Sequence, residues 1–81
     1  MAKLPVISGN ELLKFLVSKG FEAVRQKGDH VRVKKRLPDR AIVSVVPLHK
    51  RLDPGTLLGI LRQTELSRED LETYLAGKHS F

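Results

Sequence analysis

The sequence contains no cysteine and no tryptophan, and aromatic residues make up only 5% of its 81 residues. Without cysteine, the chain has neither disulfides nor thiolate ligands for a metal ion, which is consistent with a cytoplasmic protein. No apolar run approaches the roughly 20 residues of a transmembrane helix, and the opening stretch "MAKLPVISGN" lacks the apolar core of a signal peptide. We therefore expect a soluble protein that does not associate with membranes.

Acidic residues are also scarce: nine Asp and Glu stand against 15 Lys and Arg, which gives a formal net charge of +6. A small basic domain typically binds nucleic acid, an acidic protein or an anionic membrane, or uses its charge only to stay in solution. Hydrophobic residues at 41% and charged residues at 30% are ordinary for a globular protein. The length predicts a single domain over residues 1–81.

The N-terminal part of the chain carries the signals of a helix between residues 8 and 20. Ser8 and Glu11 form an S-x-x-E capping box, and Gly20 is placed to end the helix in a left-handed conformation.

The C-terminal third predicts two further helices. The pair Asp53-Pro54 is typical of a helix start, and Ser67 can cap a last short helix. Gly59, inside the first of these helices, suggests a close approach to another backbone. Residues 77–81 are expected to form a frayed tail.

Three short runs between the helices have strand character: residues 21–27, 30–35 and 41–46. Only Gly28-Asp29 separates the first two runs, which predicts a tight β-hairpin. A three-stranded antiparallel sheet cannot bury both faces here, so we expect the helices on one face and solvent on the other. The expected fold class is α+β.

Alternation along the second strand predicts where its side chains point. Val31 and Val33 should face the helices, so His30, Arg32 and Lys34 should face solvent together. Lys27 and Lys35 add positive charge nearby. The uncovered face of the sheet should therefore present one imidazole among several cations. In the first strand, Phe21 and Val24 both compete for the core, which leaves its orientation open.

An imidazole among cations suits RNA cleavage, because RNA supplies its own nucleophile, the 2′-hydroxyl. The protein has only to remove that proton or protonate the leaving oxygen, while cations stabilise the charge on the phosphate. Imidazole titrates near neutral pH and can do either. This chemistry needs no metal or cofactor, and His30, His49 and His79 look too scattered to form a metal site. The same features also fit a protein that binds RNA without cleaving it.

Three stretches resemble the HicA toxins, also described as the YcfA-like family: "KGDH" at 27–30, "VPLH" at 46–49 and "LDPGTLLGILRQTELSRED" at 52–70. Members commonly carry Ser before the first of these histidines and often a second His after it. Asp29 and Val31 stand there in this chain. The Asp29 carboxylate either repels an incoming phosphate or hydrogen-bonds the imidazole.

The resemblance implies a double-stranded-RNA-binding-domain-like fold of order α-β-β-β-α. It also implies an endoribonuclease that degrades mRNA, with His30 as the catalytic residue, and a HicB-type antitoxin that binds and blocks it. Lys27, Arg32, Lys34 and Lys35 are the expected RNA-binding residues. The alternative is a non-catalytic RNA-binding module of the same fold.

Overall fold

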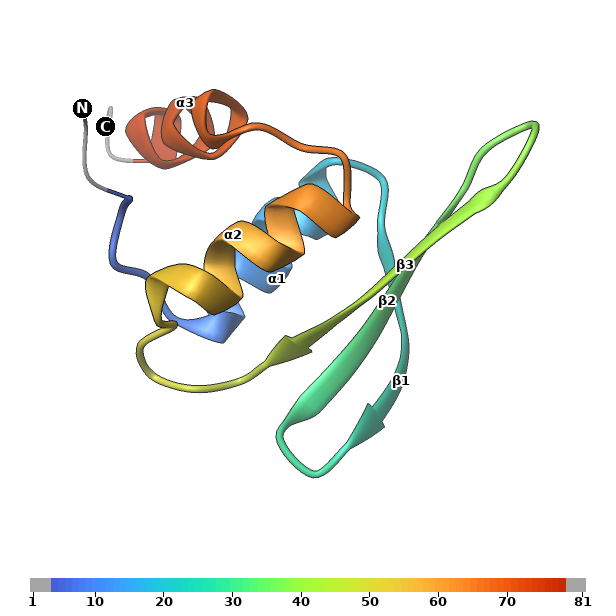
Figure 1. The fold of residues 1–81 in the computed structure, drawn as a ribbon, viewed down its shortest axis with the longest axis horizontal. Coiled ribbons are helices and arrows are strands. Elements are labelled where there is room, and N and C mark those ends of the chain that lie inside the picture. The colour runs from blue at the N-terminus through green and yellow to red at the C-terminus, as the bar shows by residue number, and fades with distance from the viewer. Residues whose placement is uncertain (1–3, 79–81) are drawn as a thin grey trace.

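The computed structural model describes residues 4–78, which form an α+β fold with an open three-stranded sheet (Figure 1). Helix α1 is followed by three antiparallel strands in the order β1-β2-β3 and then by two helices. The order matches the expected α-β-β-β-α arrangement with one helix added at the end. The elements are α1 (Gly9–Ser18), β1 (Glu22–Lys27), β2 (His30–Arg36), β3 (Ala41–Pro47), α2 (Pro54–Gln63) and α3 (Arg68–Lys78).

Helix α1 begins and ends where its sequence signals predicted. The Ser8 hydroxyl accepts a hydrogen bond from the Glu11 backbone N–H at 3.1 Å, and the Glu11 carboxylate accepts one from the Ser8 N–H at 3.4 Å. Gly20, just beyond the helix, has φ of 97°, a conformation that favours glycine. The capping box and the glycine stop are therefore confirmed.

The sheet has one covered and one open face, as expected. Val31 and Val33 are buried against the helices, whereas His30 and Arg32 are exposed on the other side. On β3, the exposed fractions of Val43 and Val45 are 44% and 40%, so even apolar side chains on the open face meet solvent. Helix α1 contacts β1 and β3, and α2 contacts β3.

A β-bulge in β1 settles which of its side chains reach the core. The pairing with β2 shifts between Ala23 and Arg25, so that Val24 is the extra residue and is half exposed. Phe21, before the strand, is buried. The bulge places Arg25 directly opposite Arg32, on the open face.

The two C-terminal helices are capped by their own acidic residues. The Asp53 carboxylate accepts the Thr56 N–H at 2.8 Å, and Ser67 and Asp70 exchange hydrogen bonds of 2.9 and 3.0 Å at the start of α3. Helix α3 continues to Lys78, two residues into the expected tail; the rest of that tail, with His79, lies outside the described residues. No helix within residues 4–78 is long and apolar enough to span a membrane.

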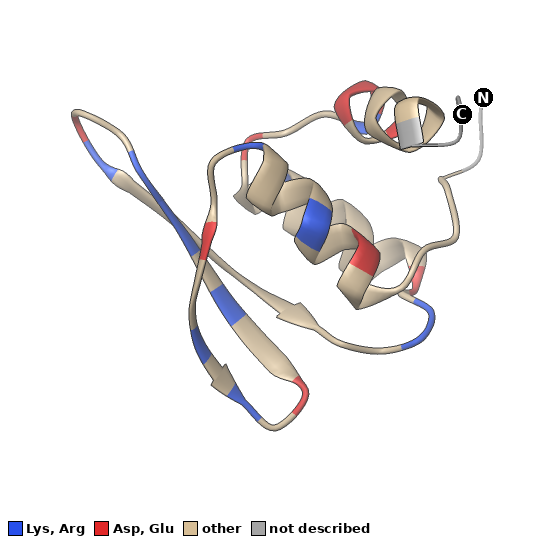
Figure 2. Cartoon of the chain, turned by 180° about the vertical axis from the view of Figure 1, so that it is seen from behind, with Lys and Arg blue, Asp and Glu red and all other residues tan. Residues whose placement is uncertain are grey.

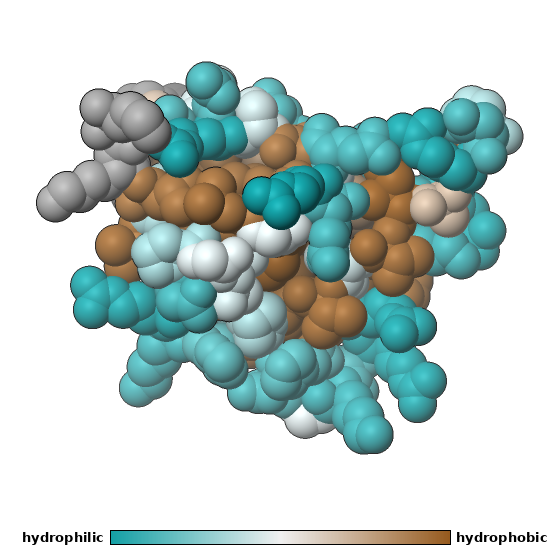
Figure 3. All heavy atoms as spheres, in the orientation of Figure 1, coloured by the Kyte–Doolittle hydropathy of each residue, from teal (hydrophilic) through white to brown (hydrophobic). Residues whose placement is uncertain are grey.

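One core connects the helices to the covered face of the sheet. In the space-filling view of the helical side, apolar side chains gather between the helices and hydrophilic ones surround them (Figure 3). The fully buried side chains come from both layers and include Leu12, Phe15, Leu16, Val33, Val46, Leu57 and Leu71. The Phe15 ring also packs against the Tyr74 ring of α3, with centroids 5.4 Å apart.

The close approach predicted at Gly59 is wrong, because nothing lies within 4 Å of the position its Cβ would occupy. Gly9 is the glycine that needs to lack a side chain. A Cβ there would lie 2.0 Å from the Pro47 carbonyl oxygen and 2.8 Å from the Leu48 Cα. Gly9 therefore lets the start of α1 touch the loop that follows β3.

Candidate functional site

His30 is the first residue of β2, directly after the Gly28-Asp29 turn. It pairs with Lys27 of β1 on one side and with Pro47 of β3 on the other. Its side chain is 56% exposed. The turn depends on Gly28, whose φ of 59° is readily adopted by glycine. The hairpin thus presents the imidazole to solvent at one end of the open face, as alternation predicted.

A shallow hollow of about 280 Å³ on the open face is lined by His30 and by three cations. These residues come from all three strands: Arg25, Lys27, His30, Arg32 and Val45. Lys and Arg positions recur along the strands, with an acidic position in the hairpin turn (Figure 2). Arg25 and Arg32 pair directly across the strands, where like charges destabilise a sheet. A bound anion would relieve that repulsion, so the hollow suits a phosphate group.

The remaining predicted contact residues lie in different places. Lys34 is on the open face, where it pairs with Glu22 of β1 and Val43 of β3. Lys35 points to the opposite face: its Nζ lies 5.8 Å from the centroid of the Phe21 ring. Lys35 therefore does not share the surface of His30. Arg25 was missed, because only the bulge brings it to this face.

Asp29 bonds the His30 imidazole instead of standing apart from it. Its Oδ1 lies 2.8 Å from His30 Nδ1, so of the two expected effects of Asp29 the hydrogen bond is present. Its other oxygen, Oδ2, lies 3.4 Å from Nε2 of His49. The two imidazole rings have centroids 6.3 Å apart and planes at 84°. His30 and His49, 19 positions apart in sequence, thus meet at one carboxylate.

Backbone hydrogen bonds hold this group of three side chains in place. The Leu48 N–H donates to the Asp29 carbonyl oxygen at 2.6 Å, which ties the loop after β3 to the hairpin turn. The Gly9 N–H donates to the His49 carbonyl oxygen at 2.9 Å, which ties the same loop to α1. The positions of both histidines therefore depend on the fold and not on their side chains alone.

The electrostatics of the nearby loop come from the α2 cap. Hydrogen bonds from the Thr56 N–H and hydroxyl lower the pKa of Asp53 below its usual value, and His49 adds a smaller lowering effect. Within the described residues, no cluster of three or more His, Asp or Glu side chains is arranged to hold a metal ion.

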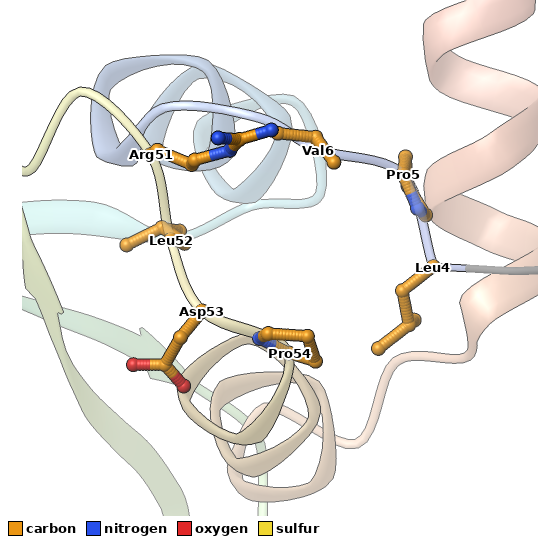
Figure 4. A pocket seen from close by; sticks show the side chains of 7 residues that line it. All are labelled: Leu4, Pro5, Val6, Arg51, Leu52, Asp53 and Pro54. Atoms are coloured by element: carbon orange, nitrogen blue, oxygen red, sulfur yellow. The ribbon is translucent and has the colours of Figure 1, made fainter.

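A second hollow, of about 380 Å³, lies at the start of α2, away from the histidines (Figure 4). Apolar side chains dominate its lining, and Arg51 and Asp53 are its two charged members. It brings together no group that could accept or donate a proton near neutral pH. The cationic hollow beside His30 is thus the better candidate for chemistry on an anion.

Comparison with known proteins agrees with this geometry. The family described as HicA toxin of bacterial toxin-antitoxin systems matches residues 9–66, which includes α1, the whole sheet and α2. No curated protein matches the sequence. Because the match covers well over half of the chain, the protein belongs to the HicA toxin family.

Proposed function

We propose that this toxin is a metal-independent endoribonuclease that cleaves mRNA, with His30 as a general acid or base. The observation that carries the proposal is the exposed His30 imidazole in a hollow with Arg25, Lys27 and Arg32. An imidazole can transfer a proton at neutral pH, and the cations can hold the phosphate that undergoes attack. Its substrate places the reaction in the cytoplasm.

The proposed reaction uses the 2′-hydroxyl of RNA as the nucleophile. Removal of its proton, or protonation of the 5′-oxygen that leaves, speeds such a reaction by about 100- to 10,000-fold per well-placed group. The hollow is open, so a single-stranded segment of RNA can reach His30 without rearrangement of the described residues. We expect Lys34, further along the open face, to contact the backbone of the same RNA.

The antitoxin that a member of this family requires would act most simply by covering the same face. We propose a HicB-like partner that presents acidic groups to Arg25, Lys27 and Arg32 and so denies RNA access to His30. Binding driven by charge weakens as salt is added, because counterions screen the attraction. An affinity that does not change with ionic strength would exclude this mode of inhibition.

The test is RNA cleavage by the wild-type chain and by His30→Ala, side by side in EDTA. The His30 side chain is exposed and contacts only Asp29 and the other members of the hollow, so the variant should fold normally. We expect loss of cleavage with little change in RNA affinity. Equal cleavage by both proteins would remove His30 from the mechanism, and tight RNA binding without turnover by the wild type would identify a binding module.

A further inference from the structure

The group formed by Asp29, His30 and His49 contains one more titratable side chain than the proposed reaction has used. Resting on the proposed function, we propose that His49 is the second proton-transfer residue of the site, and that Asp29 is the positioning residue that holds both imidazoles. The two proton transfers of the reaction would then be divided between His30 and His49.

The contacts of Asp29 determine which ring nitrogen of each histidine is left for the substrate. A carboxylate only accepts hydrogen bonds, so the nitrogens that face it, Nδ1 of His30 and Nε2 of His49, carry protons. The opposite nitrogens, Nε2 of His30 and Nδ1 of His49, remain available. An aspartate that fixes the tautomer and orientation of a catalytic imidazole is an established arrangement in other enzymes.

The separation of the rings fits a reaction with two proton transfers at one phosphate. In such a reaction the 2′-oxygen forms a bond to phosphorus as the bond to the 5′-oxygen breaks. One imidazole takes the proton of the 2′-hydroxyl, and the other, as imidazolium, gives its proton to the 5′-oxygen. The products are a 2′,3′-cyclic phosphate and a 5′-hydroxyl.

Each group must lie within about 2.6 to 3.2 Å of its own oxygen, on opposite sides of the phosphorus. Two imidazoles in contact could not meet this requirement. Centroids 6.3 Å apart leave room for the oxygens between them.

The fold holds this arrangement before any substrate binds, which reduces the cost of reaching a productive geometry. Two backbone hydrogen bonds fix the His49 loop, from Leu48 to Asp29 and from Gly9 to His49. The charged and titratable groups around the pair are Asp29 between the rings, Arg25, Lys27 and Arg32 beside His30, and Asp53 beside His49.

The test compares cleavage of a short RNA by wild type, His49→Gln, Asp29→Asn and Asp39→Asn across about pH 5 to 9. Glutamine can still donate a hydrogen bond to Asp29 but transfers no proton, so it separates catalysis from support. We expect His49→Gln to lose about 100- to 10,000-fold in rate and one limb of a bell-shaped pH profile. Asp39, exposed in the turn of the other hairpin, is the matched control and should leave cleavage unchanged.

Asp29→Asn should lower kcat by about 10- to 100-fold, because one amide group must donate to an imidazole and so reverses its tautomer. RNA affinity should hold or rise, because a negative charge beside the phosphate is gone. A second substrate, the same RNA ending in a 3′-(4-nitrophenyl) phosphodiester, needs no acid for its leaving group. Whichever histidine is the acid, its variant should regain most activity on this ester, whereas the variant of the base should not.

The outcomes separate the two proposals. If His49→Gln cleaves RNA within about 3-fold of wild type with an unchanged pH profile, His49 transfers no proton and the inference fails while the proposed function stands. If substitution of either histidine lowers both substrates equally, the division of roles is wrong. If the wild type cleaves neither substrate, the proposed function itself is refuted.

Discussion

Substitution of Gly9 by alanine tests the contact on which the position of His49 depends. A methyl group at residue 9 would lie 2.0 Å from the Pro47 carbonyl oxygen and 2.8 Å from the Leu48 Cα. Both are backbone atoms, which cannot turn aside as the end of a flexible side chain can. Either α1 or the loop after β3 must move, and the 2.9 Å hydrogen bond from the Gly9 N–H to the His49 carbonyl would break.

The expected cost follows from three contributions. Overpacking of a close contact costs about 1 to 3 kcal/mol, and loss of the hydrogen bond costs about 1 kcal/mol. Alanine in place of glycine in a helix returns about 0.5 to 1 kcal/mol. Gly9→Ala should therefore lower the free energy of unfolding by about 1 to 3 kcal/mol, which lowers the Tm of a domain of this size by about 4 to 8 °C for each kcal/mol.

Gly59→Ala is the matched control. Gly59 also lies in a helix, but its Cβ position is empty within 4 Å. This variant should gain about 0.5 to 1 kcal/mol. Urea and thermal unfolding followed by circular dichroism measure both changes. A Gly9→Ala protein as stable as Gly59→Ala would show that α1 does not press on the loop and would refute the reasoning about how His49 is held.

The RNA surface and the cap of α2 give two further predictions. Arg32→Ala should weaken RNA binding and reduce the slope of log affinity against log salt by about 0.7 for each phosphate that the protein no longer neutralises, whereas Lys35→Ala, on the other face, should leave the slope unchanged. Because folding lowers the pKa of Asp53, its stabilising effect is present above the ordinary carboxyl pKa of about 3.9 and is lost as pH falls through the lower folded value. Asp53→Asn should therefore lose less stability than wild type between about pH 6 and pH 2.5 in urea denaturation, and an equal loss would contradict the cap as its source.

The local signals in the sequence predicted most of the fold because each acts over a few residues. The Ser8–Glu11 capping box, the two-residue turn at Gly28-Asp29 and the alternation of Val31 and Val33 each depend on near neighbours. Together they place His30 on the open face. Lys35 follows the same alternation as Val33, and its place on the covered face was available from that rule.

Features that depend on distant parts of the chain were not predictable in this way. The bulge at Val24 results from competition with Phe21 for the core, and it alone turns Arg25 toward Arg32. The meeting of His49 with Asp29 requires the loop after β3 to fold back on the first hairpin. The close approach at Gly9, in place of Gly59, has the same origin, because it depends on where that loop passes α1.

The chemical nature of the RNA ends tests the central claim most directly. RNA incubated with the wild-type chain in EDTA can be analysed by mass spectrometry after the first cleavage. Attack by the 2′-hydroxyl, assisted by the exposed His30 imidazole, predicts fragments with a 2′,3′-cyclic phosphate or its hydrolysis product on one side and a 5′-hydroxyl on the other. Fragments with 5′-phosphate ends, or RNA that stays intact, would contradict the account.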